Sequence, residues 1–183
     1  MQKHLLLCFW GLVLSLAIYG QNVKAEKIIV PGSNLINMYK IDTDIYRSEQ
    51  PTEIDFKALQ EYGIHEVLNL RRWHSDNDEA RGTTLQLHRL KMRAGSVNEK
   101  QLIETLRIIY NRKGPILIHC HHGSDRTGVV CAFYRIIFQE VSKEDAIDEM
   151  TGEKYGFHRI YKNLIRIIQE ADIERIKKAV ISK

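Results

Sequence analysis

Cys120 and Arg126 are separated by five residues, two of which, Gly123 and Ser124, are small. An apolar run that begins at Ile116 enters this stretch and an amphipathic run leaves it, so the pattern predicts a strand, a tight loop and a helix. Such a loop turns successive backbone N–H groups toward one point in front of the sulfur. A nest of donors at a helix N-terminus binds phosphate oxygens and lowers the pKa of a thiol. The spacing therefore indicates an oxyanion site.

Each side chain of this stretch suits one part of a phosphoryl transfer. The Cys120 thiolate is a nucleophile for phosphorus. Arg126 has a planar set of donors that can hold two oxygens and stabilise the transition state. The Thr127 hydroxyl can donate a hydrogen bond to the sulfur and help it leave. We expect the phosphate to be bound by the loop residues His121, His122, Gly123, Ser124, Asp125 and Arg126.

The segment His119–Gly128 resembles the signature of cysteine-dependent protein tyrosine and dual-specificity phosphatases, His-Cys-x5-Arg followed by Ser or Thr. A second stretch, residues 46–51, resembles the "YRSxQP" stretch of bacterial and plant dual-specificity phosphatases. Residues 146–163 are similar to the helical end of the bacterial members. The resemblance covers nearly all of the chain after residue 25. It implies a protein tyrosine phosphatase-like fold and hydrolysis of phosphate monoesters through a cysteinyl-phosphate intermediate.

The usual general acid of such phosphatases is missing. Most of them place an aspartate on a mobile loop upstream of the cysteine, but no acidic residue lies between Ala80 and Asn98 here. Asp125 matches the Asp-Arg-Thr ending of the loop in a mycobacterial lipid and protein phosphatase and in the myotubularins, where the loop aspartate is taken to be the acid. We assign the acid to Asp125. Alternatively, Asp125 only positions Arg126 or caps the helix, and the acid is one of Asp76, Asp78, Glu79 and His88.

Other residues are expected to support the loop. His119 precedes the nucleophile in the signature. Arg71 follows a predicted strand at the edge where open α/β sheets bind ligands, so it points toward phosphate or remains solvated. Arg47 is either an ion-pair partner or a substrate contact. Cys131 lies on an apolar helix and is expected to be a core residue.

No metal and no other cofactor is predicted. His119, Cys120, His121 and His122 are adjacent, and neighbouring residues cannot all turn inward around one tetrahedral ion. We recognise no second cluster of ligating side chains elsewhere in the sequence.

The first 25 residues have the pattern of a secretory signal peptide. Lys3 and His4 precede an apolar run from Leu5 to Tyr19, and a small residue, Ala25, ends the segment. The apolar run is short for a membrane span, which is the alternative. We therefore expect cleavage after Ala25, export to the periplasm or beyond, and no stable membrane anchor afterwards.

Residues 26–183 are predicted to form a single α/β domain with a small, mostly parallel sheet flanked by helices, because strands and helices alternate. The formal net charge is +4 for the full sequence and +2 without Lys3 and Lys24 of the first 25 residues, a balance that does not predict nucleic-acid binding. Strands are expected at 35–36, 38–41, 45–48, 66–70, 84–92 and 116–119. Helices are expected at 52–63, 98–111, 129–138, 142–150 and 158–180. The residues from Asp172 onward are expected to fray.

The expected substrates are phosphorylated proteins, with phosphotyrosine first and phosphoserine or phosphothreonine as further possibilities. A phosphoinositide or inositol phosphate phosphatase is the alternative that the loop aspartate encourages, and the absence of a lysine from the loop discourages it. A weakly active phosphate-binding protein is the alternative that the missing upstream acid permits.

Overall fold

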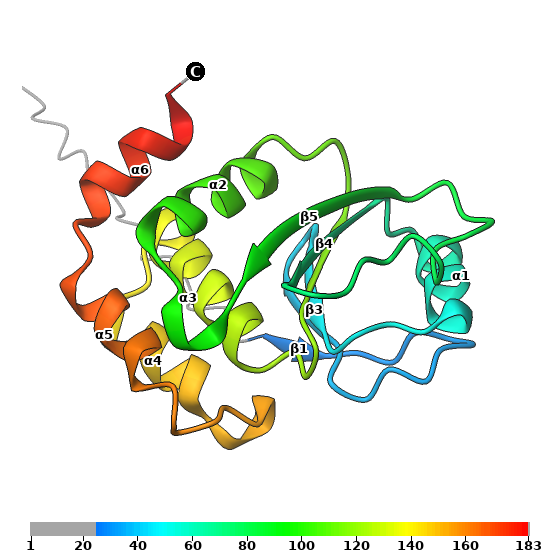
Figure 1. Ribbon diagram of the computed structural model, residues 1–183, viewed down its shortest axis with the longest axis horizontal. Coiled ribbons are helices and arrows are strands. Elements are labelled where there is room, and N and C mark those ends of the chain that lie inside the picture. Colours follow the sequence, from blue (N-terminus) through cyan, green and yellow to red (C-terminus); the bar gives the residue numbers. More distant parts are fainter. Residues whose placement is uncertain (1–24, 183) are drawn as a thin grey trace, which may run out of the picture.

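The computed structural model describes residues 25–182, which form one mixed sheet covered by helices on both faces (Figure 1). The strands lie in the order β1-β2-β3-β6-β4-β5. Strands β3, β6, β4 and β5 are parallel, whereas β1 and β2 form an antiparallel edge. Their bounds are Glu26–Lys27 (β1), Tyr39–Asp42 (β2), Ile45–Ser48 (β3), Glu66–Arg71 (β4), Gln86–Met92 (β5) and Ile116–His119 (β6). The predicted α/β class and mostly parallel sheet are confirmed.

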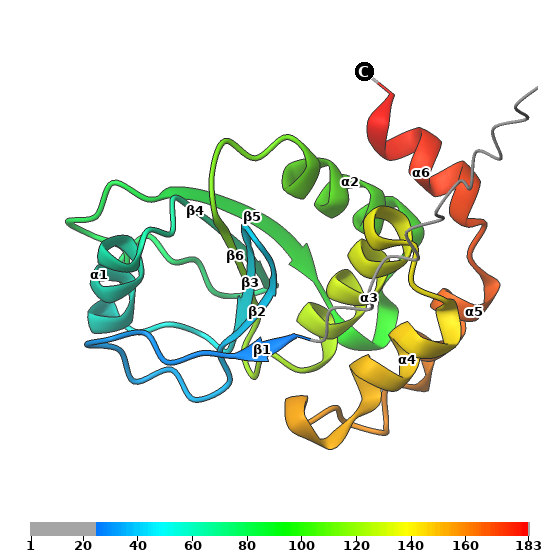
Figure 2. The ribbon, with the colours of Figure 1, turned by 180° about the vertical axis from the view of Figure 1, so that it is seen from behind.

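The helices divide unequally between the two faces of the sheet. Figures 1 and 2 show α1, Glu53–Tyr62, on one side and the other α-helices on the opposite side. Those helices are α2 (Glu99–Tyr110), α3 (Asp125–Gln139), α4 (Lys143–Thr151), α5 (Lys162–Glu170) and α6 (Ile173–Ile181), with short 3₁₀ turns at Ala94–Ser96 and Glu153–Tyr155. The buried apolar side chains accordingly form two clusters, one around α1 and a larger one around α3.

Helix α3 is central because it is buried on nearly all sides. Its residues from Thr127 to Ile137 are all buried, against the sheet and against the helices around it. A helix that is apolar all round is expected at the core of such a domain. This packing fixes the position of α3 relative to the end of β6.

The C-terminal region differs from the prediction. The segment expected to form one helix over 158–180 contains two helices, α5 and α6. The backbone of Ala171 is extended, which ends α5. Asp172 is the N-cap of α6, because its side chain accepts a hydrogen bond from the Arg175 N–H. The expected fraying from Asp172 is also wrong. Ile176 and Val180 are buried, and α6 contacts α2 through hydrogen bonds from Arg107 to the Ala179 carbonyl.

Two isoleucines that were expected to face the core are exposed, Ile160 at 83% and Ile54 at 59%. Ile160 lies in the irregular segment before α5, and Ile54 lies in the first turn of α1, where the buried side of the helix is formed by Phe56, Ala58 and Leu59. Residues 35–36, expected as a strand, are irregular.

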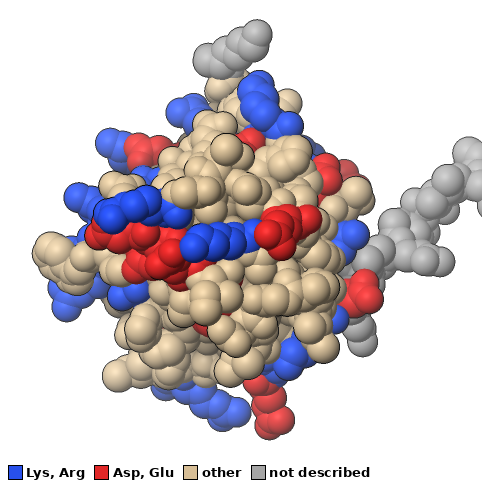
Figure 3. Space-filling model, turned by 90° about the vertical axis from the view of Figure 1, so that its right-hand side faces the viewer, with Lys and Arg blue, Asp and Glu red and all other residues tan. Residues whose placement is uncertain are grey.

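The predicted signal segment lies outside the described residues, apart from Ala25. Within residues 25–182, no helix combines the length and apolar character that crossing a membrane requires. On the face shown in Figure 3, acidic and basic side chains lie next to one another. Exposed ion pairs in the structure include Lys57–Glu53 and Arg81–Asp78.

Candidate active site

The predicted strand, loop and helix are confirmed. Strand β6 ends at His119, Cys120 follows with 1% of its surface exposed, and α3 begins at Asp125. The N–H groups in the first turn of an α-helix have no partner within the helix and carry a partial positive charge. The sulfur thus lies at the end of a strand, next to the N-terminus of a buried helix.

The loop carbonyls point outward. The oxygens of His121, His122 and Gly123 each accept a hydrogen bond from outside the loop. The donors are the Gln50 N–H (3.1 Å), Asn37 Nδ2 (2.8 Å) and Arg47 Nη2 (2.6 Å). Because the C=O and the following N–H of a trans peptide point in opposite directions, the next N–H groups face the inside of the loop. This arrangement provides the donors that an oxyanion requires.

Gly123 allows the loop to pass close to β3. Its φ is +71°, and a Cβ there would lie 2.6 Å from the backbone C and O atoms of Ser48. A side chain cannot be accommodated at that distance, so glycine is required both by the conformation and by the space.

Arg47 supports the loop from behind. Its side chain is buried, donates to the Gly123 carbonyl and stacks on the Tyr155 ring at 3.7 Å. The prediction left open whether Arg47 is an ion-pair partner or a substrate contact, but a side chain in this buried position cannot reach a substrate. Its hydrogen bond instead fixes the orientation of a loop carbonyl.

His119 and Asp76 form a buried pair next to Cys120. His119 Nε2 lies 2.9 Å from Asp76 Oδ2, and His119 Nδ1 lies 3.1 Å from the Cys120 carbonyl oxygen. Asp76 Oδ1 also accepts hydrogen bonds from Asn69 (2.8 Å) and Gln50 (3.0 Å). Burial alone would raise the pKa of Asp76, but the hydrogen bonds from His119 and Gln50 and the His119 charge prevail and hold it below the ordinary value.

Positive charge gathers around the loop. The pKa of Arg71 is lowered first by burial and next by the positive charge of Arg126. The second cause means that the two guanidinium groups lie near each other. Burial, and then His122, Arg71 and Arg126, lower the pKa of His121 in the same way. Arg71 is oriented by a 3.0 Å hydrogen bond from Nη1 to Gln50 Oε1. An anion in the loop would relieve this repulsion.

Two donors of the predicted machinery are buried without a hydrogen-bond partner among the described residues. They are the Nε of Arg126 and the hydroxyl of Thr127. Buried polar groups are nearly always paired, and exceptions in a native structure call for an explanation. Donation to a bound oxyanion from Arg126 and to the sulfur from Thr127 would supply one.

Asp125 is paired with a residue that the sequence did not suggest. Its Oδ1 accepts from the His158 N–H at 2.9 Å, and its Oδ2 lies 2.8 Å from His158 Nδ1. The Asp125 side chain is only 8% exposed, whereas that of His158 is 47% exposed. The two residues are 33 positions apart, and His158 was expected merely to begin a helix, so no local pattern could have revealed the pair.

The alternative acids are arranged differently. Asp76 lies beneath the loop, and His88 pairs with Glu66 Oε2 at 2.7 Å on the sheet. Asp78 is exposed and pairs with Arg81. Glu79 pairs with His74 at 2.8 Å and lies close enough to Arg71 for its charge to oppose, in small part, the lowering of the pKa of that arginine. Of the four alternatives, Glu79 is thus the partly exposed carboxylate whose charge acts on a residue near the loop.

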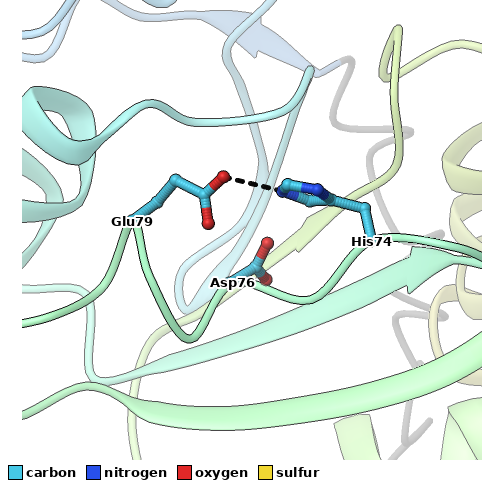
Figure 4. Close-up of side chains that lie close together, drawn as sticks. All are labelled: His74, Asp76 and Glu79. Carbon is cyan, nitrogen blue, oxygen red and sulfur yellow. Dashed lines mark ion pairs between the residues drawn. The ribbon is translucent and has the colours of Figure 1, made fainter.

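The segment after β4 also contains a second cluster of ligating side chains, contrary to the expectation from the sequence. Atoms of His74, Asp76 and Glu79 lie within 4.8 Å of one another (Figure 4). The four neighbours at positions 119–122, from which no metal site was predicted, differ in burial, although the rings of His121 and His122 lie 4.4 Å apart. His119 is buried, whereas His121 and His122 are exposed.

A groove of about 750 Å³ adjoins the loop. The loop contributes His121, His122 and Ser124 to one wall. The remaining wall is formed by residues from three segments: Ile36, Asn37, Glu49, Gln50 and Glu153 to Gly156. Part of a substrate beyond its phosphate can be held there.

Comparison with known families decides what this site belongs to. A family model described as "Polymorphic toxin system, DSP-PTPase phosphatase" matches residues 42–140, more than half of the chain. The chain belongs to this family. It is a cysteine-dependent phosphatase that hydrolyses phosphate monoesters, of the protein tyrosine and dual-specificity type. The alternative of a mere phosphate-binding protein is thereby set aside.

Relatives of this phosphatase agree with the assignment. The dual specificity protein phosphatase TpbA of Pseudomonas aeruginosa is 28% identical over 149 residues, which are 79% of this chain and 67% of the relative. The crystal structure of a Cys-to-Ser variant of TpbA in complex with phosphotyrosine is similar at a TM-score of 0.77 and 25% identity, covering 87% of this chain and 97% of that one. The catalytic core of the PP-IP phosphatase SIW14 from S. cerevisiae shares the fold, with a TM-score of 0.68 and 24% identity over 78% of this chain and 90% of that one.

Proposed function

We propose that Cys120 is the nucleophile and that the loop to Arg126 binds the phosphate of a phosphotyrosine side chain. The observation that carries the proposal is the position of Cys120, between the end of β6 and the first turn of α3, inside a loop whose carbonyls face outward. The thiolate forms a bond to phosphorus while the bond from phosphorus to the tyrosyl oxygen breaks. Water then hydrolyses the cysteinyl phosphate and releases inorganic phosphate.

Asp125 is proposed to give the leaving oxygen its proton. It occupies the first position of α3, directly before the phosphate-binding arginine, and His158 fixes its carboxyl group through two contacts. General acid catalysis requires an acid within hydrogen-bond reach of the leaving oxygen, and this proposal uses the place of Asp125 beside the loop. In the second step the same carboxylate accepts a proton from the attacking water.

Phosphoproteins fit the groove better than inositol phosphates. Its walls contain one lysine, Lys154, and two glutamates, Glu49 and Glu153, and no arginine. A ligand with several phosphates needs several cationic partners, whereas a peptide next to a phosphotyrosine needs a groove of mixed character. The phosphotyrosine complex of TpbA supports the same substrate class.

The substrate is tested by comparing kcat/KM values. The protein is incubated with a phosphotyrosine peptide, a phosphoserine peptide of the same sequence, a phosphoinositide and an inositol polyphosphate. We expect the highest kcat/KM for the phosphotyrosine peptide. A higher value for either inositol compound would replace this proposal with the alternative.

Export is proposed from the first 25 residues. Their basic start, apolar run and final Ala25 are typical of a signal peptide, and they precede the matched region. The N-terminal sequence of the protein recovered from the periplasm or medium should begin at Glu26. Recovery of the chain with Met1 in the cytoplasmic fraction alone would refute export.

A further inference from the structure

The segment between β4 and β5 brings three potential metal ligands together. Figure 4 shows the side chains of His74, Asp76 and Glu79 pointing toward one another. Their ligand atoms all lie within 4.8 Å of one another. In a tetrahedral zinc site with bonds of about 2.0–2.2 Å, neighbouring ligand atoms are about 3.3–3.6 Å apart, so small side-chain rotations would complete the geometry. The side chains of His74 and Glu79 are 33% and 25% exposed, respectively.

Two side-chain atoms of this cluster lack a hydrogen bond, although His74 and Glu79 form an ion pair. His74 Nε2 and Glu79 Oε2 are inaccessible to solvent and have no hydrogen-bond partner among residues 25–182. His74 Nε2 does lie 2.8 Å from Glu79 Oε1, but this contact does not meet the angle of a hydrogen bond. Buried nitrogen and oxygen atoms are rarely left without a hydrogen bond, and a bound ion is one explanation when this occurs. A metal ion would pair both residues at once.

Hydrogen bonds hold the Asp76 carboxylate in a fixed orientation, as is typical of a metal ligand. It is buried, and its two oxygens receive hydrogen bonds from Asn69, Gln50 and His119. Carboxylates that bind metals are typically held by such hydrogen bonds, and each oxygen can accept more than one partner. Asp76 can therefore bind an ion without giving up its contact with His119.

We propose that His74, Asp76 and Glu79 bind a divalent transition-metal ion, for which Zn²⁺ is the best match. One imidazole and two carboxylates form a ligand set that zinc accepts, and the two negative charges neutralise the ion. Three protein ligands leave a fourth position for water. Because Asp76 contacts His119, and His119 contacts the Cys120 carbonyl, the bound ion is linked to the phosphate-binding loop.

The test is a calorimetric titration with Zn²⁺ in a Cys120→Ser background, which removes a competing thiolate ligand. We expect one ion per chain, and His74→Ala and Glu79→Gln should each weaken the affinity by at least about 10-fold. His88→Ala is the matched control, because His88 also contacts a carboxylate, Glu66 Oε2 at 2.7 Å, and should leave the affinity unchanged. Melting curves without metal confirm that each variant is folded.

Two results would overturn the proposal. One is an absence of zinc binding by the background protein. The other is zinc binding that His74→Ala and Glu79→Gln leave unchanged and that His121→Ala or His122→Ala abolishes. The ion would then be held by the exposed imidazoles of the loop.

Discussion

The Asp125–His158 pair links the phosphate-binding loop to the segment before α5. Both Asp125 oxygens contact His158, one through the backbone N–H and one through the ring. A carboxyl group held this way can act as the acid or can simply fix the start of α3. The two roles have different consequences for catalysis, because only the removal of an acid slows the reaction more for a poor leaving group than for a good one.

Asp125→Asn should slow the hydrolysis of a tyrosyl or alkyl phosphate by about 10² to 10⁴-fold, the usual contribution of general acid catalysis. An aryl phosphate with a very acidic phenol should be affected much less, because its leaving group departs without a proton. The measurement is kcat for both substrates. His158→Ala keeps the backbone contact and should cause a smaller loss. An equal loss on both substrates would assign a positioning role to Asp125, and the search for the acid would then turn to Glu79.

Asp76→Asn should destabilise the fold by about 2 kcal/mol at neutral pH, because it removes a charged acceptor of buried hydrogen bonds. The folded protein holds the pKa of Asp76 below its ordinary value, so the unfolded state binds the proton more readily. The stability that Asp76 contributes is thus complete above the unfolded pKa and is lost as the pH falls through the folded one.

Urea unfolding of the parent and Asp76→Asn at several pH values measures this effect. The difference in the free energy of unfolding should be largest near neutral pH and should narrow in acid. A difference that stays constant down to the most acidic pH at which the parent folds would contradict the pairing.

At the scale of the elements, α6 shows how packing overrides a charged composition. The helix is rich in lysine, arginine and glutamate, yet Ile176 is fully buried. Arg175 also pairs with Glu99 on α2, through two hydrogen bonds of 2.7 and 2.6 Å. These contacts join the C-terminal segment to the larger core.

Ile176→Ala should lower the free energy of unfolding by about 2–5 kcal/mol, as expected for a large buried aliphatic side chain. Ile181→Ala is the matched control on the same helix, since Ile181 is 47% exposed and should change stability little. Both are measured by urea unfolding. Equal, small effects would show that α6 frays as the sequence suggested.

Hydrophobic patterns and capping residues correctly predicted the strands and helices whose bounds depend on neighbouring residues in the sequence. Strand β6, the loop and α3 follow from an apolar run, small residues and an apolar helix, and Thr52 and Gly63 mark the ends of α1. The division into α5 and α6 was missed because the hydrophobic periodicity continues across Ala171. A single extended residue followed by an N-cap is enough to separate two helices.

At the scale of the whole molecule, the loop is supported by segments far apart in the sequence. Arg47 comes from β3, Asp76 from the segment after β4, and Tyr155 and His158 from the segment between α4 and α5. The signature predicted both the proposed nucleophile Cys120 and Arg126, because the two residues lie in one short loop. It could not identify their supporting partners, because those contacts exist only after the sheet has assembled.

The most direct test of the account is the turnover of a phosphotyrosine peptide by Cys120→Ser, combined with the melting temperature in the presence of vanadate. Serine keeps the shape of the loop but is a much poorer nucleophile at neutral pH. We predict that kcat falls by about 10⁴-fold or more, while vanadate still raises the melting temperature. Turnover near the rate of the parent protein would contradict the assignment of Cys120 as the nucleophile.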